Sequence, residues 1–368
     1  MMNDVRVEVG GTLFGGWTSV RIDAGITKLA RDFAVAFTRT SGAGGIRIGV
    51  KPGDAVRVYI DSDLVLTGYV SDMELAYAAT AVTLTMRGFS KTVDLCECQV
   101  PPGSPLSFKK TSIQSIIKRL AGLYGIGVDV QVDASKSIDW DVSPTETIKS
   151  TLEKMLKQHT MLLTDNDRGE LVVLKAGGGG RASDVLATGK NLLSATYALD
   201  AKSLFSEYAV LGQGANATSE RPVTDAQVTA KALFDGIRHR VSVYSQSGDA
   251  TAAELQRRAR LLRDNAAGNS ETYRCQLQGW RQSDGALWTV NQLVRVRDEF
   301  FELDKYFLVS DVSFSLSKNG SVTDLVLRPL GAFIETDLPD KAKAAKEAAS
   351  VNTVVRKSDT AVAEWTNK

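Results

Sequence analysis

Apolar and polar residues alternate along much of the first 95 residues, which is the pattern of half-buried β-strands. In the run AVRVYI at 55–60, Val56, Val58 and Ile60 share one face and the intervening side chains share the other. Stretches rich in glycine and proline separate such runs and supply turns. Short antiparallel strands at this spacing predict a small β-barrel or sandwich over residues 1–95.

The pattern changes to a helical period after residue 96. The segment TSIQSIIKRLAGLYGIG at 111–127 places its isoleucines and leucines on one helical face. Thr111 or Ser112 is the predicted N-cap, and Gly125 stands where a left-handed residue ends a helix.

A second helix and a hairpin follow in the same stretch. Ser143, Pro144 and Glu146 match a capping box with proline at the first helical position. The run MLLTDNDRGELVVLK at 161–175 predicts a hairpin closed by residues 165–169. Together these elements predict a small α/β module with its own core.

One phrase occurs twice in the chain. VRVYIDSDLVLTGYVSD at 56–72 is matched by VRVRDEFFELDKYFLVSD at 294–311. The VRV and VSD groups are separated by similar lengths in the two copies, and both continue into a further strand. Three strands in matching order predict a duplicated β-barrel with the α/β module inserted between the copies.

The predicted fold class is therefore α+β, mainly β, with two similar small antiparallel β-barrels and an inserted α/β module. The predicted divisions are a first barrel at 1–95 with a returning strand near 190–215, the module at 96–176, a Gly-rich connector at 177–189, a second barrel at 216–335 with one helix near 250–268, and an Ala/Lys-rich tail at 336–368.

The overall charge argues against two classes of partner. Forty-four Lys+Arg and 43 Asp+Glu leave a net charge of +1, so no global field favours nucleic acid or an anionic membrane. No stretch has the roughly 20 apolar residues of a membrane-spanning helix, and no secretory signal is recognisable, so we expect no membrane insertion and first folding in a cytoplasm. Three cysteines are too few for a disulfide framework.

No catalytic, cofactor-binding or metal-binding residues are predicted. The common nucleophile, zinc-protease and phosphate-loop motifs are absent, and neither His159 nor His239 has a second ligand at metal spacing. The segment TDNDRGE resembles a calcium loop, but Lys175 occupies the position where that loop needs glutamate. We therefore expect a protein that is not an enzyme and has no cofactor.

The second copy of the repeated phrase mixes aromatic and basic residues in the pattern of a binding hairpin. These residues are Arg295, Arg297, Phe300, Phe301, Tyr306 and Phe307. Such a mixture is typical of a surface that binds single-stranded nucleic acid, or of a subunit interface. Four interspersed carboxylates cancel the positive charge, which favours the subunit interface.

Read together, these segments resemble the Mu-like baseplate hub proteins of contractile-tailed bacteriophages. The resemblance is carried by residues 51–72, 112–130, 146–174, 206–214, 275–298 and 320–333. It implies a homotrimer whose six similar barrels form a ring. The ring would join a central spike to the tail tube or to a tube-initiator protein, and it would also contact other baseplate proteins. The resemblance also implies a virion protein assembled in the host cytoplasm, through whose channel DNA passes on ejection.

Three other functions stay open at this stage. The hub of a related contractile injection system, such as a secretion-system spike or a tailocin, would have the same sequence features. A cell-wall glycan hydrolase lacks support from any catalytic signature, and a ring-shaped DNA clamp is disfavoured by the net charge. The tail at 336–368 matches no hub motif, and its Ala/Lys-rich composition fits either a partial helix that docks on the spike or a neighbouring baseplate protein, or a disordered end.

Overall fold

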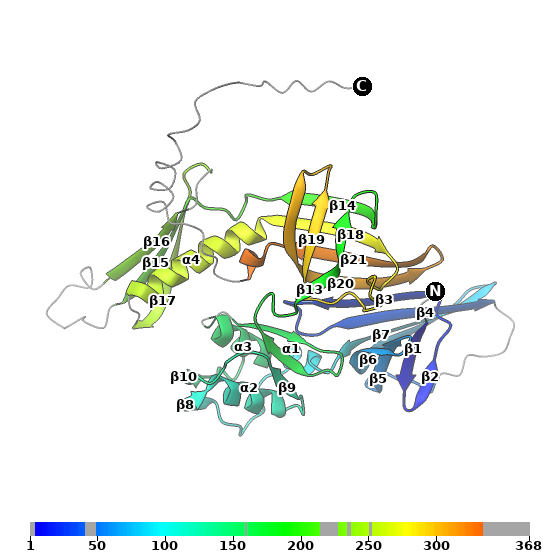
Figure 1. The fold of residues 1–368 in the computed structure, drawn as a ribbon. Helices are drawn as coiled ribbons and strands as arrows, with labels where there is room; N and C mark the ends of the chain where they lie inside the picture. Colours follow the sequence, from blue (N-terminus) through cyan, green and yellow to red (C-terminus); the bar gives the residue numbers. More distant parts are fainter. Residues whose placement is uncertain are drawn as a thin grey trace, which may run out of the picture. The chain divides into compact units, whose positions relative to one another are not determined.

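The computed structural model describes residues 4–40, 49–157, 159, 161–213, 227–233, 237–249 and 252–333 (Figure 1). The chain forms two compact units, each described by itself below. Unit 1 comprises residues 1–202 and 267–334, and unit 2 comprises 203–266 and 335–368. The predicted tail therefore lies outside the described residues. None of the described helices is long and apolar enough to cross a membrane.

The first copy of the repeat forms an antiparallel array of strands in unit 1. In spatial order these strands are β3 (Ser19–Gly25), β4 (Asp32–Thr40), β7 (Ala81–Ser90), β6 (Asp63–Tyr77), β5 (Ala55–Ile60), β1 (Val5–Val9) and β2 (Thr12–Phe14). The alternation read from the sequence is confirmed, because Val56, Val58 and Ile60 are all buried.

The second copy forms a matching array. Its strands are β14 (Leu192–Leu199), β18 (Glu271–Gln278), β21 (Gly320–Arg328), β20 (Leu303–Ser317), β19 (Leu293–Asp298) and β13 (Arg181–Ala187). All neighbours are antiparallel except β13 and β19, which run parallel.

The two arrays agree in register as well as in order. In β6–β7 the pairing shifts between Val70 and Asp72, and in β20–β21 it shifts between Val309 and Asp311. Each shift leaves one bulged serine in the repeated VSD group. Because a bulge changes strand twist at one defined place, its recurrence supports a true duplication.

One strand pairing joins the arrays into a single 13-stranded sheet. Strand β3 of the first copy pairs antiparallel with residues 311–316 of β20 in the second copy. Residues of both copies, including Phe33, Tyr273 and Trp280, belong to one apolar core. The mainly β fold is confirmed. Within the described ranges, however, no backbone pairing closes either array into a separate barrel.

The predicted returning strand near 190–215 is wrong. Strand β14 pairs with β18 of the second array, and β15 (Glu207–Gln213) pairs with β16 (Gln227–Leu233) and β17 (Val241–Asp249) in unit 2. The reason is a separate small core, in which Tyr208 and Val210 of β15 pack against α4 (Ala252–Asn269). That helix lies where the sequence placed it.

The Gly-rich connector at 177–189 is also more ordered than its composition indicated. Residues Arg181–Ala187 form β13, and the side-chain oxygen of Asn291 accepts a bond of 2.7 Å from the amide of Gly177. Cβ atoms at Gly179 would come within 2.7 Å of the Asn291 carbonyl oxygen, so glycine there permits close backbone approach.

The inserted module is confirmed as a mixed helix–sheet unit. Its elements are α1 (Val93–Glu97), β8 (Ser107–Ser112), α2 (Ile113–Gly122), β9 (Val128–Val130), β10 (Ser137–Asp141), α3 (Ile148–Lys157), β11 (Leu162–Asp165) and β12 (Leu171–Leu174). Ser112 is the N-cap of α2, since its side chain accepts from the amide of Ser115 (3.3 Å). Gly125 has a φ of +66° and ends the helical region as predicted.

The predicted start of α3 at Ser143 is wrong. The helix begins at Ile148, and the Thr147 hydroxyl accepts from the amide of Ser150 (3.2 Å). Thr147 forms a β-bridge with Gln99, and the amide of Ile148 donates to the Cys98 carbonyl. These long-range bonds fix the preceding residues outside the helix, so Ser143 and Glu146 form a turn instead.

Gly68 provides a direct test of how closely β6 and β7 approach. A Cβ atom there would stand 1.8 Å from the Phe89 carbonyl oxygen and 2.6 Å from the Ser90 Cα. We expect Gly68→Ala to reduce the free energy of unfolding by about 1–3 kcal/mol or more, because backbone must move. Gly122→Ala, which meets no atom within 4 Å, is the matched control and should be neutral or slightly stabilising in the same urea titration.

Candidate assembly interfaces

The hairpin of β19 and β20 carries the residues predicted to form a subunit interface. Arg295 holds Asp304 with two bonds, Nε to Oδ1 at 2.7 Å and Nη2 to Oδ2 at 2.8 Å. Arg297 Nε lies 3.6 Å from the same carboxylate. The hydrogen bond from Arg295 lowers the pKa of Asp304 below its ordinary value. The charges on this face are therefore largely paired within the hairpin.

The structure separates the six predicted residues into two groups. Phe300 is 83% exposed and Tyr306 46% exposed, and the Arg181 guanidinium lies 5.0 Å from the Tyr306 ring centre. Phe307 is fully buried in the core, so its prediction as a direct interface residue is wrong. Phe301 is half-buried and packs against Tyr197 and Tyr273. The two arginines, Phe300 and Tyr306 remain interface candidates.

The buried Asp298 side chain holds the turn of this hairpin through hydrogen bonds. Its Oδ2 accepts from the buried Tyr273 hydroxyl (2.6 Å), and its Oδ1 accepts from the amides of Phe300 (3.0 Å) and Phe301 (3.3 Å). Burial and this hydrogen bond raise the pKa of Tyr273. From the sequence, Asp298 counted only as a charge that cancels its neighbours, and nothing in the local pattern identified its buried partner.

Phe300 can therefore be changed without touching the hairpin's interior. We expect Phe300→Ser to leave the urea midpoint almost unchanged, because an exposed site away from caps and cores has little effect on stability. Self-association measured by sedimentation velocity should weaken, since removing an exposed aromatic group removes an interface anchor. The buried Phe307→Ser is the contrasting control and should lower stability; unchanged self-association in Phe300→Ser would exclude that side chain from the interface.

Two strand edges in unit 1 form a second candidate interface, which sequence reasoning missed. Residues 73–77 of β6 pair with β7 on one side, and β14 pairs with β18 on one side, but no described strand pairs with the other edge of either segment. Large apolar side chains are exposed there: Leu75 is 56%, Tyr77 88% and Leu199 71% exposed. Unpaired edges with apolar side chains are ready sites for strand addition.

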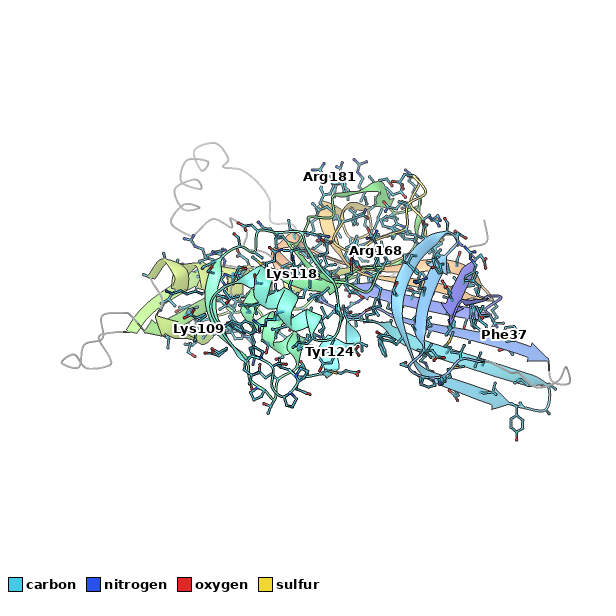
Figure 2. The ribbon with its side chains drawn as sticks, turned by 90° about the horizontal axis from the view of Figure 1, so that it is seen from below. Phe37, Lys109, Lys118, Tyr124, Arg168 and Arg181 are labelled. Carbon is cyan, nitrogen blue, oxygen red and sulfur yellow. The ribbon has the colours of Figure 1, made fainter. Side chains whose placement is uncertain are left out.

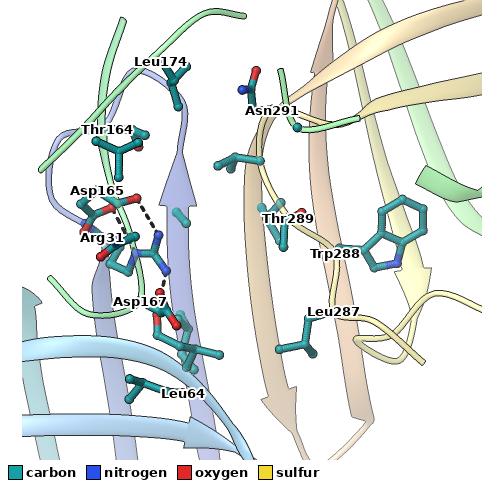
Figure 3. A pocket seen from close by; sticks show the side chains of 18 of the residues that line it. Arg31, Leu64, Thr164, Asp165, Asp167, Leu174, Leu287, Trp288, Thr289 and Asn291 are labelled. Carbon is teal, nitrogen blue, oxygen red and sulfur yellow. Dashed lines mark hydrogen bonds and ion pairs between the residues drawn. The ribbon is translucent and has the colours of Figure 1, made fainter. Parts of the chain in front are cut away.

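A buried ion pair fastens the module to the first array (Figure 3). Arg31 Nε lies 3.1 Å from Asp165 Oδ1, its Nη2 donates to the Asp165 carbonyl (2.9 Å) and its Nη1 to the Val65 carbonyl (2.8 Å). The neighbouring cavity of about 380 Å³ reaches Trp288 and Asn291 of the second array. Two of the charged groups that line this cavity, Arg31 and Asp165, are paired with each other.

A second ion pair links the two copies. Arg281 lies 2.9 Å from Asp61 and 2.7 Å from Asp63 in the β5–β6 turn, and these hydrogen bonds raise the pKa of Arg281. Figure 2 shows Lys109, Lys118 and Tyr124 on the inserted module. Lys109 pairs with Asp141 at 3.5 Å. Over the described ranges no group of three or more potential ligands could hold a metal ion.

Comparison with known proteins accounts for this combination of a duplicated array and an inserted module. Three domain families match: "Mu phage baseplate assembly protein GpP-like, N-terminal" at residues 4–90, "Baseplate hub protein gp44-like, second domain" at 92–175, and "Mu phage baseplate assembly protein GpP, fourth domain" at 251–336. The chain belongs to the Mu-like baseplate hub protein family. It is thus a structural component of a phage tail, and its family is not one of enzymes.

Similarity over the whole chain supports the same family. The chain is 28% identical over 345 residues to baseplate hub protein gp44 of Escherichia phage Mu, and the match covers 91% of this chain and 90% of gp44. The fold is similar to that of the 43 kDa tail protein of prophage MuSo2 from Shewanella oneidensis (TM-score 0.81, 24% identity, 90% of this chain and 100% of that one). A tail protein from Neisseria meningitidis also matches (TM-score 0.79, 22% identity, 90% and 98% coverage).

Proposed function

We propose that three copies of this hub close into a ring that joins the central spike to the tail tube. The observation that carries the proposal is the duplication itself: two strand arrays with the same bulge and the same order in one chain. Three chains then supply six similar arrays. A chain of this kind can mate with a six-fold tube on one face and a three-fold spike on the other, within a closed rotational symmetry.

The edges of the arrays support a closed ring over an open assembly. Inside one chain β3 already joins β20 edge to edge. The corresponding edges are the side of β6 residues 73–77 away from β7 and the side of β14 away from β18, and neither has a described strand partner. A head-to-tail contact between such edges closes when the rotation per subunit divides a full turn.

The same ring provides a passage for DNA during ejection. A net charge of +1 suits a channel through which DNA must slide, because a strongly basic lining would retain the phosphate backbone. We further propose that the ring assembles in the host cytoplasm and contacts the tube, or a tube-initiator protein, and other baseplate proteins. These partners follow from the hub role of the family.

A second candidate function is the hub of a contractile injection system. A type VI secretion system component of E. coli, described as similar to phage T4 tail proteins gp27 and gp5, shares the fold (TM-score 0.55, 9% identity, 90% of this chain and 79% of that one). Such a hub would form the same ring but act without a genome.

Electron cryomicroscopy of the purified full-length chain tests the ring. End-on views should show a central channel surrounded by six similar lobes with three-fold symmetry. Particles without a channel, or rings with another symmetry, would contradict the proposal. Adding the tube protein and the spike protein encoded with this chain should then decorate opposite faces of the ring.

A further inference from the structure

The internal joint between the two copies has a defined geometry. In the pairing of β3 with β20, Val20 is opposite Leu316, Ile22 opposite Phe314, and Ala24 opposite Val312. Of these, Val20, Ile22, Phe314 and Val312 are buried. The joint is thus a strand pairing with an apolar face against the shared core.

The duplication shows which strands correspond to β3 and β20. In the first copy Asp72 of β6 pairs with Arg87 of β7, and in the second copy Asp311 of β20 pairs with Val326 of β21. Asp311 follows Asp72 by 239 residues and Val326 follows Arg87 by the same number, so one offset relates both strands. Residue Phe314 of β20 therefore corresponds to Leu75 of β6. The outer half of β6 is the counterpart of the segment that joins β3.

The counterpart of β3 follows from the same ladder. Gly88 and Leu327 are equivalent by that shift, and they pair with Phe33 and Tyr273 respectively. Phe33 pairs next with Ile22. In the second copy Tyr273 pairs with Tyr197 of β14. Tyr197 is therefore the equivalent of Ile22, and β14 is the equivalent of β3.

Both counterparts lack the partner that they have in the internal joint. No described strand pairs with the outer edge of β14 or with residues 73–77 of β6 beyond β7. Leu75, Tyr77 and Leu199 are exposed at these edges, whereas Phe314, the counterpart of Leu75, is buried and Leu316, the counterpart of Tyr77, packs against the core. Exposed apolar side chains on unpaired edges indicate a surface that another strand covers.

We propose that residues 73–77 of one subunit pair antiparallel with residues 195–199 of a neighbouring copy, with Leu75 opposite Tyr197, so that every joint in the ring repeats the internal joint. The occupant is a second copy of this chain, because the two edges complement each other through the chain's own repeat. This inference rests on the homotrimer of the proposed function and adds the strands and the register that hold it together. Met73 then lies opposite Leu199, and Tyr77 opposite Ala195.

The charged residues at the end of this joint are compatible with the register. It brings Asp72 opposite Asp200 of the neighbour, a pair of like charges that would oppose association if left alone. Each carboxylate has its own cation, however: Arg87 Nη1 lies 3.0 Å from Asp72, and Lys202 Nζ lies 3.9 Å from Asp200.

The internal joint also shows where engineered cysteines would meet. The amide of Ile26 donates to the Ser310 carbonyl (2.8 Å), which makes Gly25 and Asp311 a non-hydrogen-bonded pair. Such pairs alternate along the ladder, so Arg21 and Ser315 are another, with Cα atoms about 4.5 Å apart in this pair type. Their counterparts are Ala76 and Thr196, both exposed, and that separation permits a disulfide.

The test is disulfide formation in the full-length chain carrying Ala76→Cys and Thr196→Cys, oxidised at pH 8. Both variants also carry Cys98→Ser, which removes one native thiol, and the other two native thiols, Cys96 and Cys275, should stay unreactive. Burial raises the pKa of Cys96 to about 11 and the pKa of Cys275 to about 12, so both remain protonated at that pH. The control pair is Ala76→Cys with Ala198→Cys, shifted by two residues on the same face.

We expect covalent dimers and trimers on non-reducing gels for the first pair, at several-fold higher yield than for the shifted control and not for either single variant. Native mass spectrometry of the same samples tests the trimer separately from the joint. If a trimer forms but the first pair gives no cross-link, or the shifted pair cross-links in higher yield, the proposed joint is wrong while the trimer still stands. A monomer at every concentration overturns the trimer, and the joint with it.

Discussion

Replacing Asp165 with alanine is expected to lower the free energy of unfolding by about 3–5 kcal/mol, because it leaves the largely buried Arg31 guanidinium without its counter-charge. Asp165 is buried, and it binds Arg31 through both its side chain and its carbonyl. The pair connects the first array to the β11–β12 hairpin of the inserted module, so its loss should loosen the module before the sheet. Urea denaturation followed by tryptophan fluorescence measures the effect.

A double-mutant cycle isolates the charge contribution. Arg31→Met alone should also be destabilising, because it leaves the Asp165 carboxylate buried and unpaired. Combining Arg31→Met with Asp165→Leu should recover much of the loss, since two apolar side chains leave no unpaired charge. Arg168→Ala, on the exposed turn of the same hairpin, is the control and should change stability little. A cost below about 1 kcal/mol for Asp165→Ala would contradict the role given to this pair.

Asp298→Ala is expected to have the next largest effect, with each buried donor it strands costing about 1–3 kcal/mol. The variant leaves the Tyr273 hydroxyl and the Phe300 amide without their acceptor. The β19–β20 turn should then lose its order, so self-association should fall together with stability. Asp298→Asn keeps an acceptor oxygen in place and should lie between the wild type and Asp298→Ala in a urea titration.

The same contact predicts a pH dependence at alkaline pH. The pKa of Tyr273 is raised in the folded chain, first by burial and then by its bond to Asp298, whereas an unfolded tyrosine titrates near pH 10. Stability from this group is therefore complete below about pH 10 and decreases as the pH rises above that value. Tyr273→Phe should flatten this alkaline decrease. An identical pH profile for the variant and the wild type would refute the assignment.

Local signals allowed much of the fold to be predicted. The alternation in β5, the cap at Ser112, the left-handed Gly125 and the β11–β12 hairpin all depend on residues close together in sequence. The repeated VRV…VSD phrase worked over a longer range, because both copies must build the same bulge.

The errors arose where distant residues decide the outcome. The start of α3 is set by Gln99 and the carbonyl of Cys98, some fifty residues before it. The edge-to-edge joining of β3 to β20 is a contact between the two copies, which no local pattern encodes. Phe307 could have been placed correctly from parity alone, because it follows Tyr306 in a strand and must face the opposite side.

Native mass spectrometry of the full-length chain across a concentration series tests the central claim most directly. We expect the 39.7 kDa chain to appear as a trimer whose proportion rises with concentration. A chain that stays monomeric at every concentration, including after the spike protein encoded with it is added, would contradict the ring.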